Sequence, residues 1–492
     1  MQPNILMLFP DQWRGDWIAA LGDLPLRTPN IDALIARGTS LGRAWTPSPL
    51  CAPARSCLAT GKRYGEAPVL HNQMDNPFGT DTFYTRLRDV GYQTGNAGKS
   101  DLLKGGDSWG ATGRHVIDGT DQLAGLGFTH GMDSCGKKAA EKILKSGAVE
   151  PYTQMLKARG LEAAFLEDYA RRPVSTPDRP PMADWISGRI ATPPGAFAYT
   201  EPAPLPDEAY NDNFVGRVAL DTLQGFDKGQ PWFLMVNFPG PHDPMDVTAS
   251  MLDGWDEVTF PLPRLRETTD PERQQRIRRR YAAMIENIDR WIGRYLAHLE
   301  ESGQLGNTLV VFASDHGEML GDRNLWKKQV PFEPSVHVPM VLAGPGVPSR
   351  GHLAGLPANL LDLPPTFLAL AGAEVPADYA GFDLSGWLGG GSYPRETTCA
   401  GLGPWRAICD GRYKLVCGFR DDLFQEAQQF EPFDPESFDD GLLHDLHEDP
   451  EETRNLRAAL PGVRDRLLAA LREEYGPTLP SLRRRLADAA TL

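Results

Sequence analysis

Long apolar runs are missing from this sequence of 492 residues. No stretch approaches the roughly 20 consecutive apolar residues that a membrane-spanning helix requires. The first eleven residues have no positively charged region, and their apolar run is too short for the hydrophobic part of a secretory signal. These absences predict a protein that makes no contact with a membrane and is cytoplasmic.

Cysteine is scarce as well. The six cysteines stand at positions 51, 57, 135, 399, 409 and 417, without the close pairs that are typical of metal sites. Together with the expected cytoplasmic location, this scatter predicts reduced thiols. A disulfide between Cys409 and Cys417 across a hairpin is the alternative to two buried thiols.

An excess of positive charge is also absent, since the formal net charge is −15. An acidic chain does not attract nucleic acid or an anionic membrane through its overall field. We therefore expect no nucleic-acid partner. A site for an anionic substrate has to be a local cluster of basic side chains.

The sequence does contain enough apolar material for a packed core, since 41% of its residues are hydrophobic and 23% are charged. Nearly continuous apolar runs predict buried strands, and apolar stripes at helical spacing predict amphipathic helices between them. The expected strands cover residues 4–9, 91–98, 232–238, 308–314 and 336–342, and the expected helices cover 28–38, 81–90, 212–225, 270–303 and 356–371. This alternation predicts an α/β fold with a large, mostly parallel central sheet sandwiched by helices.

The character of the sequence changes after about residue 375. Short strands at 405–409 and 413–417 flank the turn Asp410-Gly411, which is a strong hairpin signal. We therefore predict a catalytic domain of residues 1–375 and a smaller C-terminal domain of residues 376–492 with an antiparallel sheet and a tail. The expected exposure of the tail leaves a homo-oligomer open as the assembly.

The stretch from Pro49 to Gly61 holds a thiol and a guanidinium four residues apart, in Cys51 and Arg55. Pro53 favours a helix start, so Cys51 is expected just before it, where backbone N–H groups and the helix dipole attract an anion. Arg55 offers a planar set of donors to an oxyanion one turn later. On this spacing alone, a nucleophile beside an anion site and a buried structural cysteine are equally supported. A cysteine-dependent phosphatase would instead need its arginine six residues after the cysteine.

Polar side chains stand after the other expected strands too. The residues that follow the strands ending near 9, 98, 238 and 314 are Asp11, Lys99, His242, and the pair Asp315 and His316. The carboxyl ends of parallel strands meet at one edge of a sheet, so these side chains are expected to converge. Asp11, Asp315 and His316 would bind a divalent cation there, and an anion would lie among Lys99, Lys328, Arg55 and His242. The alternatives are capping aspartates, a hydrogen-bonded loop histidine and solvated lysines. The converged arrangement predicts a metal-dependent hydrolase of a sulfate or phosphate ester.

The run Cys51-x-Pro53-x-Arg55-x-x-x-x-Thr60-Gly61 resembles the signature of the type I sulfatases of the alkaline phosphatase superfamily. The resemblance covers nearly the whole chain. It includes Asp11-Gln12, Gly98-Lys99, Pro241-His242, Ser314-Asp315-His316-Gly317, Lys328, Leu443-His444-Asp445-Leu446 and Asp449-Pro450-Glu451-Glu452.

The resemblance implies that a formylglycine-generating enzyme oxidises Cys51 to Cα-formylglycine, whose hydrate attacks the sulfur of a small sulfate ester, either aryl or alkyl. It implies one divalent metal, Ca²⁺ in the first place with Mn²⁺ or Mg²⁺ as alternatives, held by residue 51 together with Asp11, Gln12, Asp315 and His316. Arg55 would polarise the hydrate. Lys99 and Lys328 would bind sulfate oxygens and stabilise the leaving group, and His242 would act as an acid or a sulfate ligand.

The chain departs from the family pattern at several positions. Gln12 and His316 stand where many sulfatases have Asp and Asn, which is more similar to choline sulfatases and phosphonate monoester hydrolases. Asp101 replaces a histidine that would contact formylglycine and substrate, and His115 is a candidate substitute. A phosphonate monoester or phosphate diester hydrolase is therefore the alternative activity. A non-catalytic binding protein is disfavoured, because all but one of the charged motif positions carry a suitable group.

Overall fold

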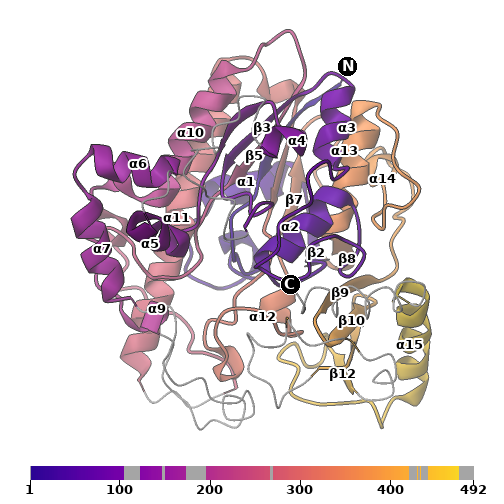
Figure 1. Cartoon of the computed structure of the whole chain (residues 1–492). Coiled ribbons are helices and arrows are strands. Elements are labelled where there is room, and N and C mark those ends of the chain that lie inside the picture. The colour runs from indigo at the N-terminus through magenta and orange to yellow at the C-terminus, as the bar shows by residue number, and fades with distance from the viewer. Residues whose placement is uncertain are drawn as a thin grey trace.

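The computed structural model describes residues 2–104, 122–146, 150–172, 195–265, 270–419, 429, 433 and 441–475 (Figure 1). An eight-stranded sheet with the order β4-β3-β5-β1-β6-β7-β2-β8 runs through the larger part of the molecule. Its strands are β1 (Asn4–Leu8), β2 (Thr39–Trp45), β3 (Gln93–Gly98), β4 (His130–Asp133), β5 (Trp232–Asn237), β6 (Thr308–Ala313), β7 (Met340–Ala343) and β8 (Gly351–Asn359). All neighbouring pairs are parallel except the two that β7 makes, with β6 and with β2.

Helices cover both faces of this sheet, because the central strands are apolar on both sides. In β1, Leu6 and Leu8 belong to one buried cluster, and Ile5 and Met7 belong to another. The helices are α1 (Pro29–Arg37), α2 (Cys51–Thr60), α3 (Phe83–Asp89), α4 (Gln122–Gly125), α5 (Lys137–Ser146), α6 (Pro151–Ala158), α7 (Glu162–Ala170), α9 (Gly195–Ala198), α10 (Asn211–Gly225), α11 (Pro271–Glu301), α12 (Glu333–Val336), α13 (Leu363–Ala371), α14 (Ser385–Leu388) and α15 (Pro461–Tyr475). α1, α10 and α11 pack on the first face, and α3, α13 and α14 on the second.

A separate, smaller antiparallel sheet lies beside the large one (Figure 1). Its order is β12-β11-β10-β9, with β9 (Thr398–Leu402), β10 (Trp405–Cys409), β11 (Tyr413–Cys417) and β12 (Gly441–Asp445). α15 packs against it through Leu467, Leu471 and Tyr475. The predicted fold class is thereby confirmed, while the division of the chain at residue 375 stays a prediction.

Two details differ from expectation, and one alternative that the sequence left open is decided. Residues 356–359 belong to strand β8, and α13 begins only at Leu363, with Pro364 and Pro365 in its first turn, where their missing N–H groups cost nothing. Cys51 is the first residue of α2 and does not precede it. Cys409 and Cys417 are free thiols, and Cys409 faces Lys414 in the hairpin register, so the disulfide alternative is wrong.

No helix among the described ranges is long and apolar enough to cross a membrane.

Candidate active site

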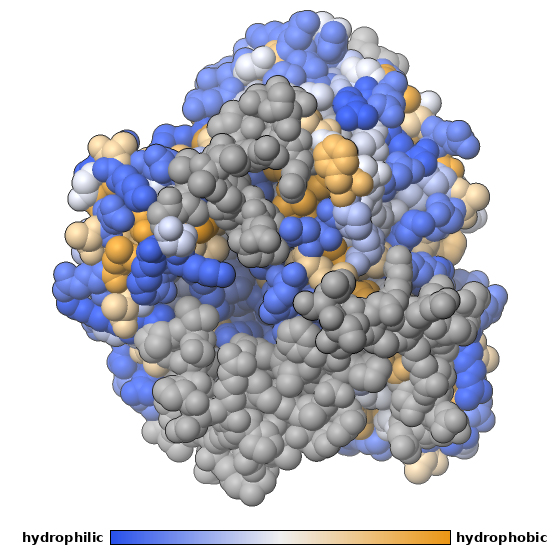
Figure 2. All heavy atoms as spheres, viewed as in Figure 1, coloured by the Kyte–Doolittle hydropathy of each residue, from blue (hydrophilic) through white to orange (hydrophobic). Residues whose placement is uncertain are grey.

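The carboxyl ends of the central strands meet where α2 begins. Asp11 follows β1, and its N–H donates to the carbonyl oxygen of Phe238 after β5 at 3.0 Å. Lys99 follows β3, and its N–H donates to the carbonyl oxygen of Asn237 at 3.0 Å. The parallel pairing of neighbouring strands thus brings together side chains that are far apart in the sequence. Figure 2 shows a hollow lined by hydrophilic surface near the middle of the face in view.

Four side chains lie close enough together to hold a metal ion. One potential ligand atom from each of Asp11, Cys51, Asp315 and His316 lies within 4.8 Å of the others, and all four residues are buried. Cys51 Sγ is 3.2 Å from His316 Nε2 and 3.9 Å from Asp11 Oδ1. His316 Nδ1 lies 3.0 Å from the carbonyl oxygen of Gly317, which fixes the tautomer that leaves Nε2 as a ligand atom. Two carboxylates and an imidazole in one buried cluster fit a divalent cation.

Gln12 lies beside this cluster in a left-handed backbone conformation, with φ +69°. Its N–H donates to Asp315 Oδ1 at 3.0 Å, and its side-chain amide donates to Glu318 Oε2 at 2.5 Å. Its amide oxygen accepts from Lys328 Nζ at 2.5 Å. These contacts hold a conformation that is unfavourable for a residue with a Cβ. They also hold the amide oxygen against the Lys328 ammonium.

Arg55 joins the carboxylates to the strand ends. Its Nε donates to Asp315 Oδ2 at 2.9 Å, and its Nη1 donates to Asn237 Oδ1 at 2.6 Å and to the carbonyl oxygen of Lys99 at 2.8 Å. The third nitrogen, Nη2, is 3.7 Å from Asp11 Oδ2 and forms no hydrogen bond within the described structure. Nη2 is therefore a buried donor available to a substrate or a modified residue 51.

Two lysines lie near Cys51, Asp11 and Gln12. The Lys99 ammonium donates to the Asp11 carboxylate and lies 3.1 Å from Asp101 Oδ2. Lys328 Nζ lies 2.8 Å from His242 Nε2. Burial, together with the Lys328 charge, lowers the pKa of His242 to about 4, so the imidazole is neutral near pH 7.

The electrostatics of the site separate Cys51 from the other thiols. Burial alone would raise the pKa of the Cys51 thiol, but Lys104, Lys328 and Lys99 lower it well below its ordinary value. Burial raises the pKa of Cys57 in the same helix. Groups whose pKa is moved by specific charged neighbours are concentrated at functional sites.

The structure brings together all the predicted site residues that it describes. Asp101 is included through its contacts with lysines, since its Oδ2 lies 2.5 Å from Lys104 Nζ and 3.1 Å from Lys99 Nζ. His115 lies outside the described residues. The sequence analysis did not single out four partners of the site: Asn237, Asp243, Glu318 and Lys138. Asp243 adjoins the predicted His242, and Glu318 lies two residues after the predicted His316. Asn237 is the last residue of β5 and has no predicted site residue beside it, and nothing in the local pattern around Lys138 indicates that it pairs with Asp243 at 2.5 Å.

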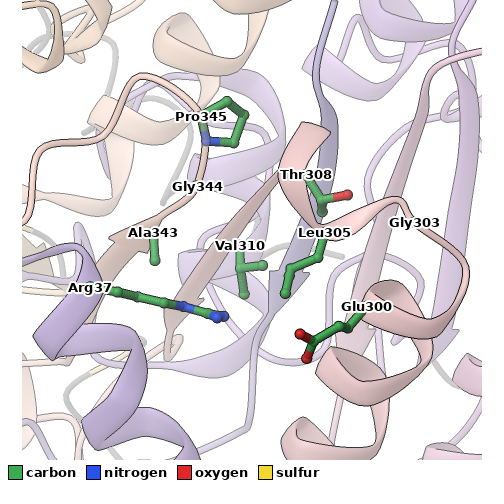
Figure 3. Close-up of a pocket in the computed structure, with 10 residues that line it drawn as sticks. Arg37, Glu300, Gly303, Leu305, Thr308, Val310, Ala343, Gly344 and Pro345 are labelled. Carbon is green, nitrogen blue, oxygen red and sulfur yellow. The ribbon is translucent and has the colours of Figure 1, made fainter.

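A second hollow lies at the opposite edge of the sheet (Figure 3). It has a volume of about 550 Å³, and Thr308, the first residue of β6, lies in its wall, whereas Asp315 follows the last residue of that strand. Arg37 and Glu300 extend toward it from the ends of α1 and α11. It contains none of the residues of the cluster described above.

Comparison with known proteins gives consistent results. A sulfatase family model matches residues 3–373. An arylsulfatase of Clostridium perfringens is 24% identical over 481 residues, which cover 93% of this chain and 90% of the relative. A choline-sulfatase of Rhizobium meliloti is 28% identical over 494 residues, covering 92% and 82%. Among solved structures, the phosphonate monoester hydrolase from Silicibacter pomeroyi has a TM-score of 0.72 at 24% identity, covering 97% of this chain and 96% of that one.

Proposed function

Because the chain belongs to the sulfatase family and is a sulfuric ester hydrolase, we propose that it cleaves sulfate monoesters of aryl or small alkyl alcohols with residue 51 as the nucleophile. The observation that carries this proposal is the position of Cys51. Its Sγ shares a buried cluster with three potential metal ligands. Arg55, Lys99 and Lys328 surround the cluster with positive charge, as a tetrahedral anion requires.

We propose that a formylglycine-generating enzyme converts Cys51 to formylglycine. The conversion would be a two-electron oxidation of the side chain, in which the Cβ–S bond breaks, sulfur leaves as sulfide and a Cβ=O bond forms, with the oxidant supplied through the modifying enzyme. One hydroxyl of the hydrated aldehyde would attack sulfur while the bond from sulfur to the alcohol oxygen breaks and the alcohol leaves. Loss of the proton from the second hydroxyl would then break the bond between the side-chain carbon and the sulfate oxygen, which releases sulfate and restores the aldehyde.

A divalent cation in the cluster would be held by residue 51, Asp11, Gln12, Asp315 and His316. It supplies positive charge to the sulfate oxygens and to the nucleophile. Calcium is the first candidate, and Mn²⁺ or Mg²⁺ are alternatives. The imidazole of His316 and the neutral amide of Gln12 make Mn²⁺ more suitable than it would be in a cluster of carboxylates alone.

The remaining residues bind the anion and hold protons. Lys328 holds a proton at Nζ between the Gln12 oxygen and the neutral His242, where it is available to a sulfate oxygen or to the leaving alkoxide. Nδ1 of His242 lies 2.6 Å from the carbonyl oxygen of Asp243, so the neutral ring presents Nε2 as an acceptor to the Lys328 ammonium. The ring would act as an acid or donate to a sulfate oxygen only when Nε2 is protonated. The positive charge of Lys99 offsets the negative charges of the Asp11 and Asp101 carboxylates. Arg55 orients residue 51 through its remaining donor, Nη2.

Removal of the metal tests the cluster. Exhaustive chelation is expected to lower kcat/KM for 4-nitrophenyl sulfate by roughly 10²-fold or more, because the charge that offsets the sulfate oxygens is lost. Adding back Ca²⁺ or Mn²⁺ is expected to restore activity and to raise the thermal midpoint with increasing cation concentration. Asp315→Asn should lose the shift in midpoint. The proposed metal site would be wrong if the chelated enzyme kept full activity and if its thermal midpoint did not change on addition of Ca²⁺, Mn²⁺ or Mg²⁺.

The choice of substrate tests the reaction. The second candidate is phosphonate monoester or phosphate diester hydrolysis, which the Gln12 and His316 pair favours because it lowers the negative charge of the ligand set. We expect kcat/KM for 4-nitrophenyl sulfate to exceed that for an aryl phosphonate monoester with the same leaving group. Activity on the phosphonate alone would contradict the first proposal and support the second. A panel of aryl and alkyl sulfates then identifies the alcohol.

A further inference from the structure

The loop that carries Lys328 has an unfavourable backbone. Five of its residues other than glycine have φ between +50° and +82°: Leu320, Arg323, Asn324, Lys327 and Gln329. Residues with a Cβ rarely adopt this conformation, so contacts from elsewhere have to hold it. The last two of the five flank Lys328 directly. The position of the Lys328 ammonium therefore depends on what holds the loop.

Part of what holds the loop is a turn near the C-terminal end of the described chain. Arg323 Nη1 donates to the carbonyl oxygens of Glu451 and Glu452, at 2.8 and 3.0 Å. At the other end of the loop, the N–H of Glu333 donates to Glu452 Oε2 at 2.8 Å. Arg323 and Glu333 lie five residues before and five residues after Lys328. The turn thus binds the loop on both sides of the lysine.

Lys414 on β11 anchors this turn to the small sheet. Its Nζ lies 2.8 Å from Glu452 Oε1 and 3.1 Å from Glu333 Oε1, and the side chain is fully buried. Arg43 on β2 lies 3.0 Å from the second oxygen of Glu333. Burial alone would raise the pKa of Glu333, but Lys414 and Arg43 lower it to about 2. The group is therefore ionised near neutral pH, and each carboxylate has a cation beside it.

We propose that Glu452 and Lys414 are positioning residues for Lys328. Through Glu333 and Arg323, the small sheet fixes the loop so that the Lys328 ammonium stays within hydrogen-bond distance of Gln12 and His242. Neither residue touches the reacting atoms. The proposal rests on the proposed function in assigning Lys328 to the sulfate. By this proposal, the segment Asp449-Pro450-Glu451-Glu452 and Lys414 affect catalysis through the position of Lys328, without contact with the substrate.

A double-mutant cycle separates positioning from general stability. Glu452→Gln keeps an oxygen for the Glu333 N–H but removes the charge that faces Lys414, and Lys414→Met removes the anchor itself. Each is expected to lower kcat/KM for 4-nitrophenyl sulfate roughly 10- to 100-fold when Lys328 is present, the scale of a misplaced catalytic group. In a Lys328→Ala background, the same changes are expected to lower kcat/KM by less than about two-fold further, because the ammonium that they position has been removed. Equal losses in both backgrounds would overturn the proposal.

Arg406 supplies the matched control. It is a fully buried cation on β10 of the same sheet, and its Nη1 donates to the carbonyl oxygens of Gly403 and Trp405. Arg406→Met is expected to lower the thermal midpoint as Lys414→Met does but to leave kcat/KM of the folded protein within about two-fold. An equal activity loss in both variants would assign the effect to the integrity of the sheet.

The cycle is run on the full chain, with formylglycine occupancy measured by intact mass. If Lys414→Met does not fold, Glu452→Gln carries the cycle. If the wild-type protein cleaves only an aryl phosphonate monoester, the proposed function fails, and the cycle is repeated with that substrate, where the same pattern of coupling is expected. A modified wild-type protein without activity on either substrate overturns both the proposed function and the positioning role.

Discussion

Replacing Cys51 by alanine is expected to lower kcat for sulfate-ester hydrolysis by at least about 10⁴-fold, on the scale seen when an enzyme loses its covalent nucleophile. Cys51 Sγ lies 3.2 Å from His316 Nε2, within the proposed metal cluster, and no other cysteine belongs to that cluster. Alanine is a good helix former and leaves the first turn of α2 intact, so the variant should fold. Single-turnover rates on 4-nitrophenyl sulfate give the loss.

Cys57 provides a control within the same helix. It is fully buried six residues after Cys51 and packs in the cluster that contains the small sheet. Cys57→Ala is expected to cost about 1 kcal/mol of unfolding free energy and to leave kcat within about two-fold. Intact mass of protein from the native host should show residue 51 with sulfur exchanged for oxygen and hydrogen lost. A native, fully active protein with a thiol at position 51 would contradict formylglycine as the nucleophile.

The central strands could be predicted because their sequence is apolar on both faces. β1 and β6 are buried along their whole length, and their apolar runs are visible without any knowledge of their neighbours. β2 and β8 were missed for the opposite reason. β2 contains the partly exposed Gly42 and Arg43, and β8 forms the edge of the sheet with alternating exposure and Pro357 within it. Their strand conformation follows from pairing with each other, which no local pattern reveals.

The candidate site divides in the same way. Residues two or three positions after a buried strand, such as Asp11 and Asp315, could be expected to converge, because parallel strands end at one edge. The partners of Arg55 could not be predicted in this way. Asn237 comes within hydrogen-bond distance of Arg55 only because of the register in which β5 pairs with β3. The contact between Glu333 and Glu452 spans 119 positions of sequence and depends on how the two sheets pack. Sequence pattern thus predicts the groups that react better than the groups that hold them.

Arg55→Met is expected to lower kcat/KM roughly 10²- to 10³-fold, as loss of a preorganised donor does. It is also expected to lower the free energy of unfolding by about 3–5 kcal/mol, because a buried carboxylate loses its partner. Arg55 donates to Asp315 Oδ2, Asn237 Oδ1 and the carbonyl oxygen of Lys99, so one side chain fixes the ends of three strands. Arg55→Lys keeps the charge but not the planar set of donors, so it should recover stability more than activity. Steady-state kinetics and chemical denaturation measure the two effects.

Arg395 is the matched control for this prediction. It forms a buried pair with Asp362, with its Nε 2.8 Å from Oδ2, and it follows α14, away from the strand ends that carry the site. Arg395→Met should lower the free energy of unfolding by a similar amount, about 3–5 kcal/mol, without changing kcat of the folded fraction. If both arginine variants lose stability but neither loses kcat/KM, Arg55 stabilises the fold and has no part in catalysis. If only Arg55→Met loses activity, and Arg55→Lys does not restore it, the planar donors and the buried Nη2 act on the reacting group.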